Sequence, residues 1–205
     1  MTRAESRLST RANALTALRL VCGPLLMLAL LERAAWPAFT LFWLAVGPDL
    51  LDGRVARRYG EASALGGFLD NVTDAAFVSL GLAALALLGE APALLPALVA
   101  LAFLQYTLDS RVMQAKRAAR RSRAESDPQG STLRASALGR WNGIAYFVPI
   151  GTVVVRDALA LGWPPPHGVL WLGWALVATT LLSMADRARA LLRARRSGTA
   201  PGSRA

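Results

Sequence analysis

Hydrophobic residues in this chain are gathered into long runs, and polar, charged or Pro- and Gly-rich segments separate the runs. Most runs hold about twenty residues, which is the length of an α-helix that crosses the hydrocarbon core of a bilayer. The pattern therefore predicts an all-α, polytopic membrane protein with six transmembrane helices. The predicted helices cover residues 13–31, 36–58, 65–88, 92–113, 133–155 and 169–182, the last from 162 if the preceding proline turn is partly buried.

The composition supports one membrane domain. Of the 205 residues, 54% are hydrophobic, which is excessive for a soluble domain of this size. Six helices of about 20 residues would use roughly 120 residues. We assign residues 1–12 to a cytoplasmic N-terminal segment, 13–186 to the six-helix membrane domain and 187–205 to a basic C-terminal tail, which is predicted to be disordered.

The formal charge of +10 raises nucleic acid as a partner, but the positions of the basic residues argue against it. The arginines lie between apolar runs, and no aromatic-basic recognition motif is present. If both termini are cytoplasmic, only Arg33 and Arg156 of the 23 Lys and Arg residues fall in outer segments. Basic residues concentrate on the cytoplasmic side of membrane proteins, so the charge predicts topology and no nucleic-acid partner.

Four aspartates stand at the cytoplasmic ends of the second and third predicted helices, in the pattern D-x2-D-G-x2-A-R-x8-G-x3-D-x3-D. Asp49 and Asp52 have i,i+3 spacing and Asp70 and Asp74 have i,i+4 spacing, so each pair lies on one face of its helix. The pairs match in depth, so a helical hairpin would gather four carboxylates around a polar cavity that faces the cytoplasm. Hard divalent ions are the natural counterions of such a cluster, which predicts a two-metal site.

Other residues of the pattern suit a phosphorylated ligand. Gly53 and Gly66 place no side chain beside the acids, so a ligand or a neighbouring helix can approach the backbone closely. Arg57 lies one helical turn beyond Gly53, toward the aqueous end, where its planar guanidinium can hold phosphate oxygens. These features indicate a phosphate anhydride bridged by metal ions.

The eight residues of this pattern resemble the signature of the class I CDP-alcohol phosphotransferase family of integral membrane enzymes. The pattern is long and chemically demanding, and the hydropathy layout extends the resemblance from about Asn13 to Met184. The resemblance implies that Asp49, Asp52, Asp70 and Asp74 ligate two Mg²⁺ ions, with Mn²⁺ as an alternative. It implies that Asp74 is also the catalytic base that deprotonates the acceptor hydroxyl. It implies a CDP-binding pocket formed by Asn13, Thr16, Asp49, Asp52, Gly53, Ala56, Arg57, Gly66 and Asp70.

The start of the first predicted helix carries Asn13, Thr16 and Arg19 on one face. One interpretation is a capping residue followed by an arginine that snorkels to the membrane surface. The resemblance favours another, because family members often have Pro-Asn-x2-Thr-x2-Arg here, and this segment helps to frame the nucleotide. Ala12 replaces the proline in this chain, which affects the start of the helix more than the chemistry.

Two arginines are candidates for binding the acceptor. Arg111 lies within an apolar register near the same membrane face as the acids, where it can hold a phosphate or snorkel at the end of the helix. Family members that use glycerol 3-phosphate often show Gly-Lys-x-Lys-Thr-x2-Gln near the start of the fifth helix. This chain has Gly139-Arg140-Trp141-Asn142-Gly143 instead, so Arg140 keeps one cation and the second lysine is lost.

The resemblance implies transfer of a phosphatidyl group from CDP-diacylglycerol to a small alcohol, with release of CMP, at the cytoplasmic face of a bacterial inner membrane. Glycerol 3-phosphate is the favoured acceptor. Inositol phosphate, serine, phosphatidylglycerol and a CDP-amino alcohol donor stay open. Relatives tend to be homodimers, and small residues such as Gly81 permit close helix contacts between copies or within one chain. A divalent cation transporter is the alternative of another class, because intramembrane acids also serve transport.

Overall fold

The computed structural model describes the backbone of residues 3–52, 64–105, 107 and 137–197, and the side chains of residues 16–48, 69–105, 107 and 141–189. These residues form helices and connecting turns, with no strand among them, which confirms the predicted all-α class. The helices are α1 (Arg3–Leu31), α2 (Ala35–Asp52), α3 (Ala64–Leu87), an unlabelled segment (Leu95–Gln105), α5 (Ala137–Ala145), α6 (Phe147–Ala158) and α7 (Pro166–Ser197).

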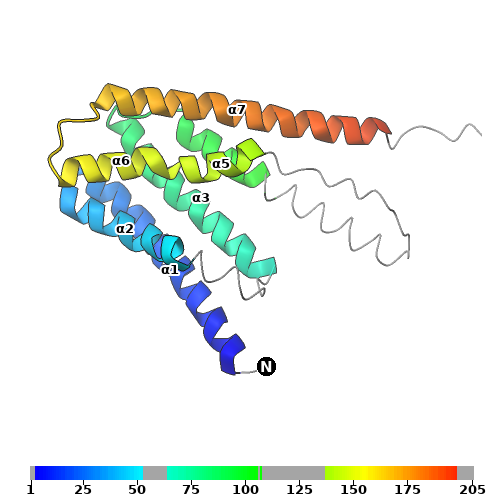
Figure 1. Cartoon of the computed structure of the whole chain (residues 1–205), viewed down its shortest axis with the longest axis horizontal. Coiled ribbons are helices and arrows are strands. Elements are labelled where there is room, and N and C mark those ends of the chain that lie inside the picture. The colour runs from blue at the N-terminus through cyan, green and yellow to red at the C-terminus, as the bar shows by residue number, and fades with distance from the viewer. Residues whose placement is uncertain (1–2, 53–63, 106, 108–136, 198–205) are drawn as a thin grey trace, which may run out of the picture.

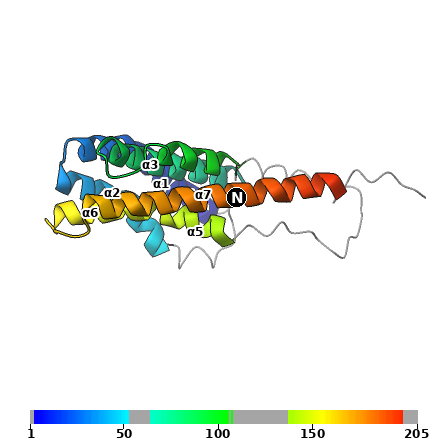
Figure 2. The same cartoon turned by 90° about the horizontal axis from the view of Figure 1, so that it is seen from above.

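The helices pack as a bundle in which α1 contacts both α2 and α3, and α6 contacts α2, α3 and α7 (Figure 1). Figure 2 shows α7 running along the length of the molecule, and its C-terminal part extends past the other described helices in both views. A buried hydrogen bond of 2.8 Å between the hydroxyls of Tyr146 and Thr180 joins α7 to the turn between α5 and α6.

The helix boundaries follow the hydropathy pattern, with three differences. The first helix begins at Arg3 rather than at residue 13, and α7 continues to Ser197, so the first part of the predicted tail is helical. The predicted fifth helix is interrupted at Tyr146, between α5 and α6. Pro149 explains the interruption, because it has no N–H for the carbonyl of Ala145, four residues earlier.

Two of the described helical stretches, Leu69–Leu87 and Pro166–Arg189, are long and apolar enough to cross a membrane. Two shorter apolar stretches are Thr16–Leu31 and Leu95–Gln105. The six predicted spans and their orientation remain a prediction.

The core lies where α1, α2, α3 and α6 meet, and its largest fully buried side chains include Leu26, Phe77 and Ile150. Gly81 makes the contact between α3 and α6 close, because a Cβ atom there would lie 2.6 Å from Ile150 Cδ1. The small residue that could have served a contact between copies is therefore used for packing within the chain.

One end of the bundle is held by a partly buried cluster of charges, which we call the distal cluster: Arg33, Glu90, Arg156 and Asp157. Glu90 accepts from Arg33 Nη1 at 3.1 Å and lies 2.8 Å from Arg156 Nη1, and Arg156 Nε donates to Asp157 at 2.7 Å. Glu90 and Arg156 are buried, at 2% and 7% exposed. Arg33 follows α1, Glu90 follows α3, and Arg156 and Asp157 lie in the last turn of α6. The cluster therefore holds the ends of these three helices together.

Candidate active site

Asp70 and Asp74 lie one turn apart on α3 and face the same side of the helix. Their spacing of four residues brings the carboxylates close together, as predicted from the sequence. Asp70 is half exposed, at 52%, and Asp74 is less exposed, at 24%. Asp74 lines a cavity and Asp70 is open to the surroundings, so the pair is accessible to a ligand.

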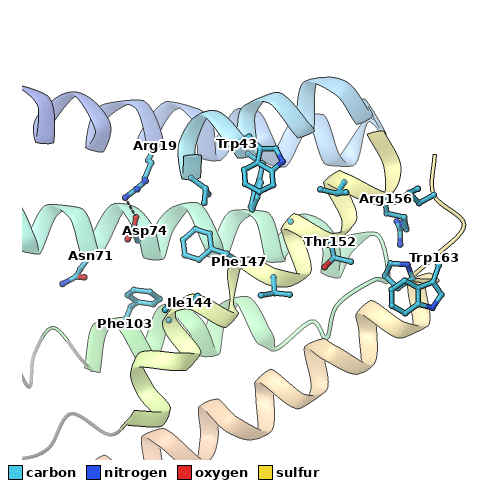
Figure 3. Close-up of a pocket in the computed structure, with 18 residues that line it drawn as sticks. Arg19, Trp43, Asn71, Asp74, Phe103, Ile144, Phe147, Thr152, Arg156 and Trp163 are labelled. Atoms are coloured by element: carbon cyan, nitrogen blue, oxygen red, sulfur yellow. Dashed lines mark hydrogen bonds and ion pairs between the residues drawn. The ribbon is translucent and has the colours of Figure 1, made fainter. Parts of the chain in front are cut away.

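Both carboxylates bind one cation, the guanidinium of Arg19 on α1. Arg19 Nη1 donates to Asp70 Oδ1 at 3.1 Å and to Asp74 Oδ1 at 2.5 Å, and the bond to Asp74 is visible in Figure 3. Arg19 is 3% exposed, so the interpretation of this residue as a snorkelling arginine is wrong. We call Arg19, Asp70 and Asp74 the acid cluster; its described members carry two negative charges against one positive charge.

The same arginine ties the acid cluster to α2. Arg19 Nε donates to the backbone carbonyl of Ala45 at 3.0 Å. This carbonyl is next to the one that Pro48 leaves without a helical partner, the carbonyl of Leu44, because proline has no N–H to donate. Arg19 therefore attaches α1 to α2 next to the backbone position where Pro48 interrupts the helical hydrogen bonds, one turn before Asp49.

A cavity of about 860 Å³ begins at the acid cluster and follows α6 toward the distal cluster (Figure 3). Its charged side chains are at the ends, with Arg19 and Asp74 beside Asn71 at one end and Arg156 at the other. Between them the wall is mostly apolar, with Thr152 as a polar residue on α6. The lining of that middle part includes Phe42, Trp43, Phe103, Ile144, Phe147 and Val148. From Phe147 to Arg156 the cavity follows α6 for roughly 14 Å, which is long enough for a substantial part of an extended hydrocarbon chain.

The other predicted site residues lie partly or wholly outside the described part of the chain. Thr16 is described and lies on α1 one turn before Arg19. For five residues the structure describes the helical backbone alone: Asn13 in α1, Asp49 and Asp52 in α2, Gly66 in α3 and Arg140 in α5. Outside the described residues lie Gly53, Ala56, Arg57 and Arg111.

The described residues fit a divalent cation at the acid cluster, although they do not complete its ligand set. Arg19 Nη1 shows that a positive group fits between the carboxylates of Asp70 and Asp74, within bonding distance of both. Carboxylate oxygens are the ligands that Mg²⁺ prefers. Among the described side chains no three His, Cys, Asp or Glu residues could hold a metal ion together, and those of Asp49 and Asp52 are not among them. The four-carboxylate site stays a prediction.

The sequence does not indicate the partners of Arg19 or the distal cluster. Its pattern distinguishes Arg19 only by the spacing from Asn13 and Thr16, and Arg33 and Arg156 only as basic residues of outer segments. The available signal was charge within apolar runs, since a buried ion must be paired. It could not name the partners, because Arg19 and Asp74 are separated by 55 positions and Arg156 and Glu90 by 66.

The comparisons with known proteins agree with the motif. The family model described as CDP-alcohol phosphatidyltransferase matches residues 9–184. A protein of two Mycobacterium tuberculosis strains, named "Probable phosphatidylglycerophosphate synthase", is 36% identical over 94 residues, which cover 43% of this chain and 45% of the relative. The "CDP-diacylglycerol--glycerol-3-phosphate 3-phosphatidyltransferase" of Cereibacter sphaeroides is 40% identical over 74 residues, or 34% of each chain.

These matches span less than half of the length of the curated relatives, whereas the family model covers most of this chain. No solved structure matches the chain significantly. The matched range contains α2, α3 and the four aspartates, so the motif, the helices that carry it and the family model coincide. The chain belongs to the CDP-alcohol phosphatidyltransferase family.

Proposed function

We propose that this protein transfers a phosphatidyl group from CDP-diacylglycerol to a small alcohol, with release of CMP, in a reaction that depends on divalent metal ions. The observation that carries the proposal is the joining of two features. Asp70 and Asp74 are held together on α3, and an apolar cavity begins beside Asp74. A substrate with a charged diphosphate and hydrocarbon chains needs both features in one place.

The cavity is suited to an acyl chain of the donor. Its apolar wall runs along α6, and several lining residues are exposed at the surface of the bundle, including Ile144 at 66% and Val148 at 47%. A lipid in the surrounding bilayer could therefore reach the acid cluster from the side. Burial of each methylene group contributes about 0.8 kcal/mol, so the cavity would hold the donor through its chain while the diphosphate lies at the acids.

The metal ions would be held by Asp49, Asp52, Asp70 and Asp74. When bound, Mg²⁺ or Mn²⁺ ions would supply positive charge that neutralises the diphosphate and stabilises the negative charge developing on the departing CMP. The chain's own part is to hold the carboxylates in register on α2 and α3. The Arg19 bond to Ala45 supports that register, because it links α1 to both helices.

Asp74 is the proposed base. The acceptor hydroxyl oxygen forms a bond to the phosphorus that carries diacylglycerol, and the bond from that phosphorus to the bridging oxygen breaks. Its electron pair leaves with CMP. Asp74 takes the hydroxyl proton as attack proceeds from the face opposite CMP. Because Asp74 lines the cavity and Asp70 does not, Asp74 is better placed to meet a substrate that enters there.

For the nucleotide we propose the pocket formed by Asn13, Thr16, Gly53, Ala56, Arg57 and Gly66 together with the acids. Its best support is the position of Thr16 on α1, one turn before the arginine that binds Asp70 and Asp74. The start of α1 is thereby placed next to the acid cluster. Arg57 would contribute a planar guanidinium for phosphate oxygens.

Glycerol 3-phosphate is the proposed acceptor, with Arg111 and Arg140 as partners for its phosphate. Its support is the name of the Cereibacter sphaeroides relative, which specifies glycerol 3-phosphate, and the name of the Mycobacterium tuberculosis relatives, which specifies phosphatidylglycerophosphate. We place the protein in a bacterial inner membrane, with six spans, the acid cluster and both termini toward the cytoplasm, as a homodimer. The two long apolar helices support the membrane placement. The orientation is supported by the charge pattern, because only Arg33 and Arg156 of the 23 Lys and Arg residues lie in the outer segments.

An assay of the purified protein tests the proposal. Mixed micelles with CDP-diacylglycerol and Mg²⁺ receive glycerol 3-phosphate, inositol phosphate, serine or phosphatidylglycerol in turn, and CMP release is measured with and without EDTA. We expect release with glycerol 3-phosphate, abolished by EDTA. Release with another acceptor would correct the acceptor alone. If no acceptor releases CMP and the protein carries divalent ions into liposomes, the interpretation as a transporter would replace the interpretation as an enzyme.

A further inference from the structure

One nitrogen atom of Arg19 lies between two carboxylates that are proposed to bind metal ions. The residue therefore bears on metal binding as well as on the charge of the acids. Its Nη1 lies 3.1 Å from Asp70 Oδ1 and 2.5 Å from Asp74 Oδ1. Mg²⁺ takes oxygen ligands at about 2.0–2.1 Å, which is shorter than either nitrogen contact, so an ion held by these two oxygens would compete with the nitrogen for them.

The two cations also repel each other. At a separation of a few ångströms, two like charges near a protein surface interact by several times the thermal energy, whereas the same charges exposed to bulk water interact weakly. Arg19 is 3% exposed and is poorly shielded by water. A divalent ion must accordingly displace this guanidinium from the carboxylates before it can bind them at full strength.

The structure allows such a displacement. The Nε atom of Arg19 holds the backbone carbonyl of Ala45 at 3.0 Å, so the side chain keeps a partner on α2 when Nη1 leaves the acids. Asp70 is half exposed, which gives an ion from solution access to one carboxylate while Arg19 is still in place. Replacement of Arg19 by the ion can thus proceed without leaving either carboxylate unpaired.

We propose that Arg19 is a positioning residue that occupies the cation position between Asp70 and Asp74 in the metal-free protein and competes with the divalent ion for it. Arg19 keeps the carboxylates together before the metal arrives and lowers the metal affinity of the site. The inference rests on the metal-dependent function proposed above. It differs from a purely structural role for Arg19, which would make metal binding weaker when the residue is removed.

Direct metal binding tests the competition without any turnover. Mn²⁺ is titrated into the purified full-length protein in detergent, without substrate, and free Mn²⁺ is followed by electron paramagnetic resonance. For Arg19→Gln we expect a Kd about tenfold lower than that of the wild type, because one neighbouring positive charge is lost. For Arg19→Lys we expect a smaller decrease in Kd, because lysine keeps the charge but lacks the Nε anchor to Ala45.

Arg33→Gln is the matched control. It removes one arginine that follows the same helix, roughly 20 Å along the axis from Arg19, and that binds Glu90 rather than the acids. Its Kd for Mn²⁺ should equal that of the wild type. Thermal melting and size-exclusion chromatography check that each variant is folded. If Arg19→Gln does not fold, the Kd of Arg19→Lys tests the competition instead.

The outcomes separate this inference from the function beneath it. A lower Kd in the Arg19 variants, with Arg33→Gln unchanged, supports the competition. An equal or higher Kd in the Arg19 variants overturns it and leaves the metal site intact. Absence of Mn²⁺ binding in the wild type and in every variant overturns both the metal site and the competition.

Discussion

The acid cluster and the distal cluster are built from the same residue types, yet their surroundings give them different tasks. In the distal cluster two arginines and two carboxylates balance, and the central carboxylate, Glu90, is 2% exposed. Among the described side chains of the acid cluster, one buried arginine binds two carboxylates, and Asp70 is 52% exposed. A central carboxylate that is almost fully buried is suited to holding helices together, whereas a half-exposed carboxylate can be reached by a ligand. We therefore expect the distal cluster to act mainly on stability and the acid cluster mainly on the proposed reaction.

Substitution of one carboxylate in each cluster should give the largest difference in kcat. Asp74 and Asp157 are similarly exposed, at 24% and 30%, and each accepts a hydrogen bond from a buried arginine. We expect Asp74→Asn to lower kcat about 10³-fold through loss of the base, with nucleotide binding largely retained. Asp157→Asn should retain the wild-type kcat. Initial rates of CMP release and equilibrium binding of the nucleotide measure the two effects, and equal turnover in Asp74→Asn would remove its role as base.

The free energy of unfolding should depend more on the distal cluster than on the acid cluster. Glu90→Gln removes the buried charge that pairs with Arg33 and Arg156, and loss of one partner of a buried ion pair costs about 3–5 kcal/mol. Asp70→Asn removes a half-exposed partner, for which we expect a loss of less than about 1 kcal/mol. The free energy of unfolding is measured by denaturation in mixed detergent micelles.

In Glu90→Gln the kcat of the protein that remains folded should be unchanged, because the distal cluster does not contact the acids. The comparison fails if Asp70→Asn proves the more destabilising substitution of the two. It also fails if Glu90→Gln lowers kcat in protein that melts as a single folded species, since the distal cluster would then act on the reaction.

Local patterns in the sequence predict the helices and the Asp70–Asp74 pair, because helix formation and i,i+4 contacts depend on neighbours in the chain. Pairing across the bundle is different. Nothing near Arg19 in the sequence indicates Asp74, and nothing near Glu90 indicates Arg156, since only the packing of α1, α3 and α6 brings them together. The break in the helix at Tyr146 can be predicted from Pro149, but the apolar run there is long enough to suggest one continuous helix.

A substitution in the cavity between the two clusters should have the smallest effect. It tests whether the cavity and the acid cluster bind different parts of the donor. Gly143 lines the cavity, and a Cβ atom added there meets no heavy atom within 4 Å, so we expect the side chain of Gly143→Leu to extend into open space at the cavity. We expect the KM for a long-chain CDP-diacylglycerol to rise about fivefold, and the KM for a dihexanoyl donor to stay nearly constant, because the shorter chains lose less apolar burial.

Gly162→Leu is the control for this substitution. Gly162 also has open space around its Cβ position, but it is not among the residues that line the cavity. A rise in KM that is equal for both donors would mean that Gly143→Leu disturbs the acids or the nucleotide and not the chain. A rise confined to the long-chain donor would show that the apolar wall binds hydrocarbon, separately from the part of the donor that both substrates share.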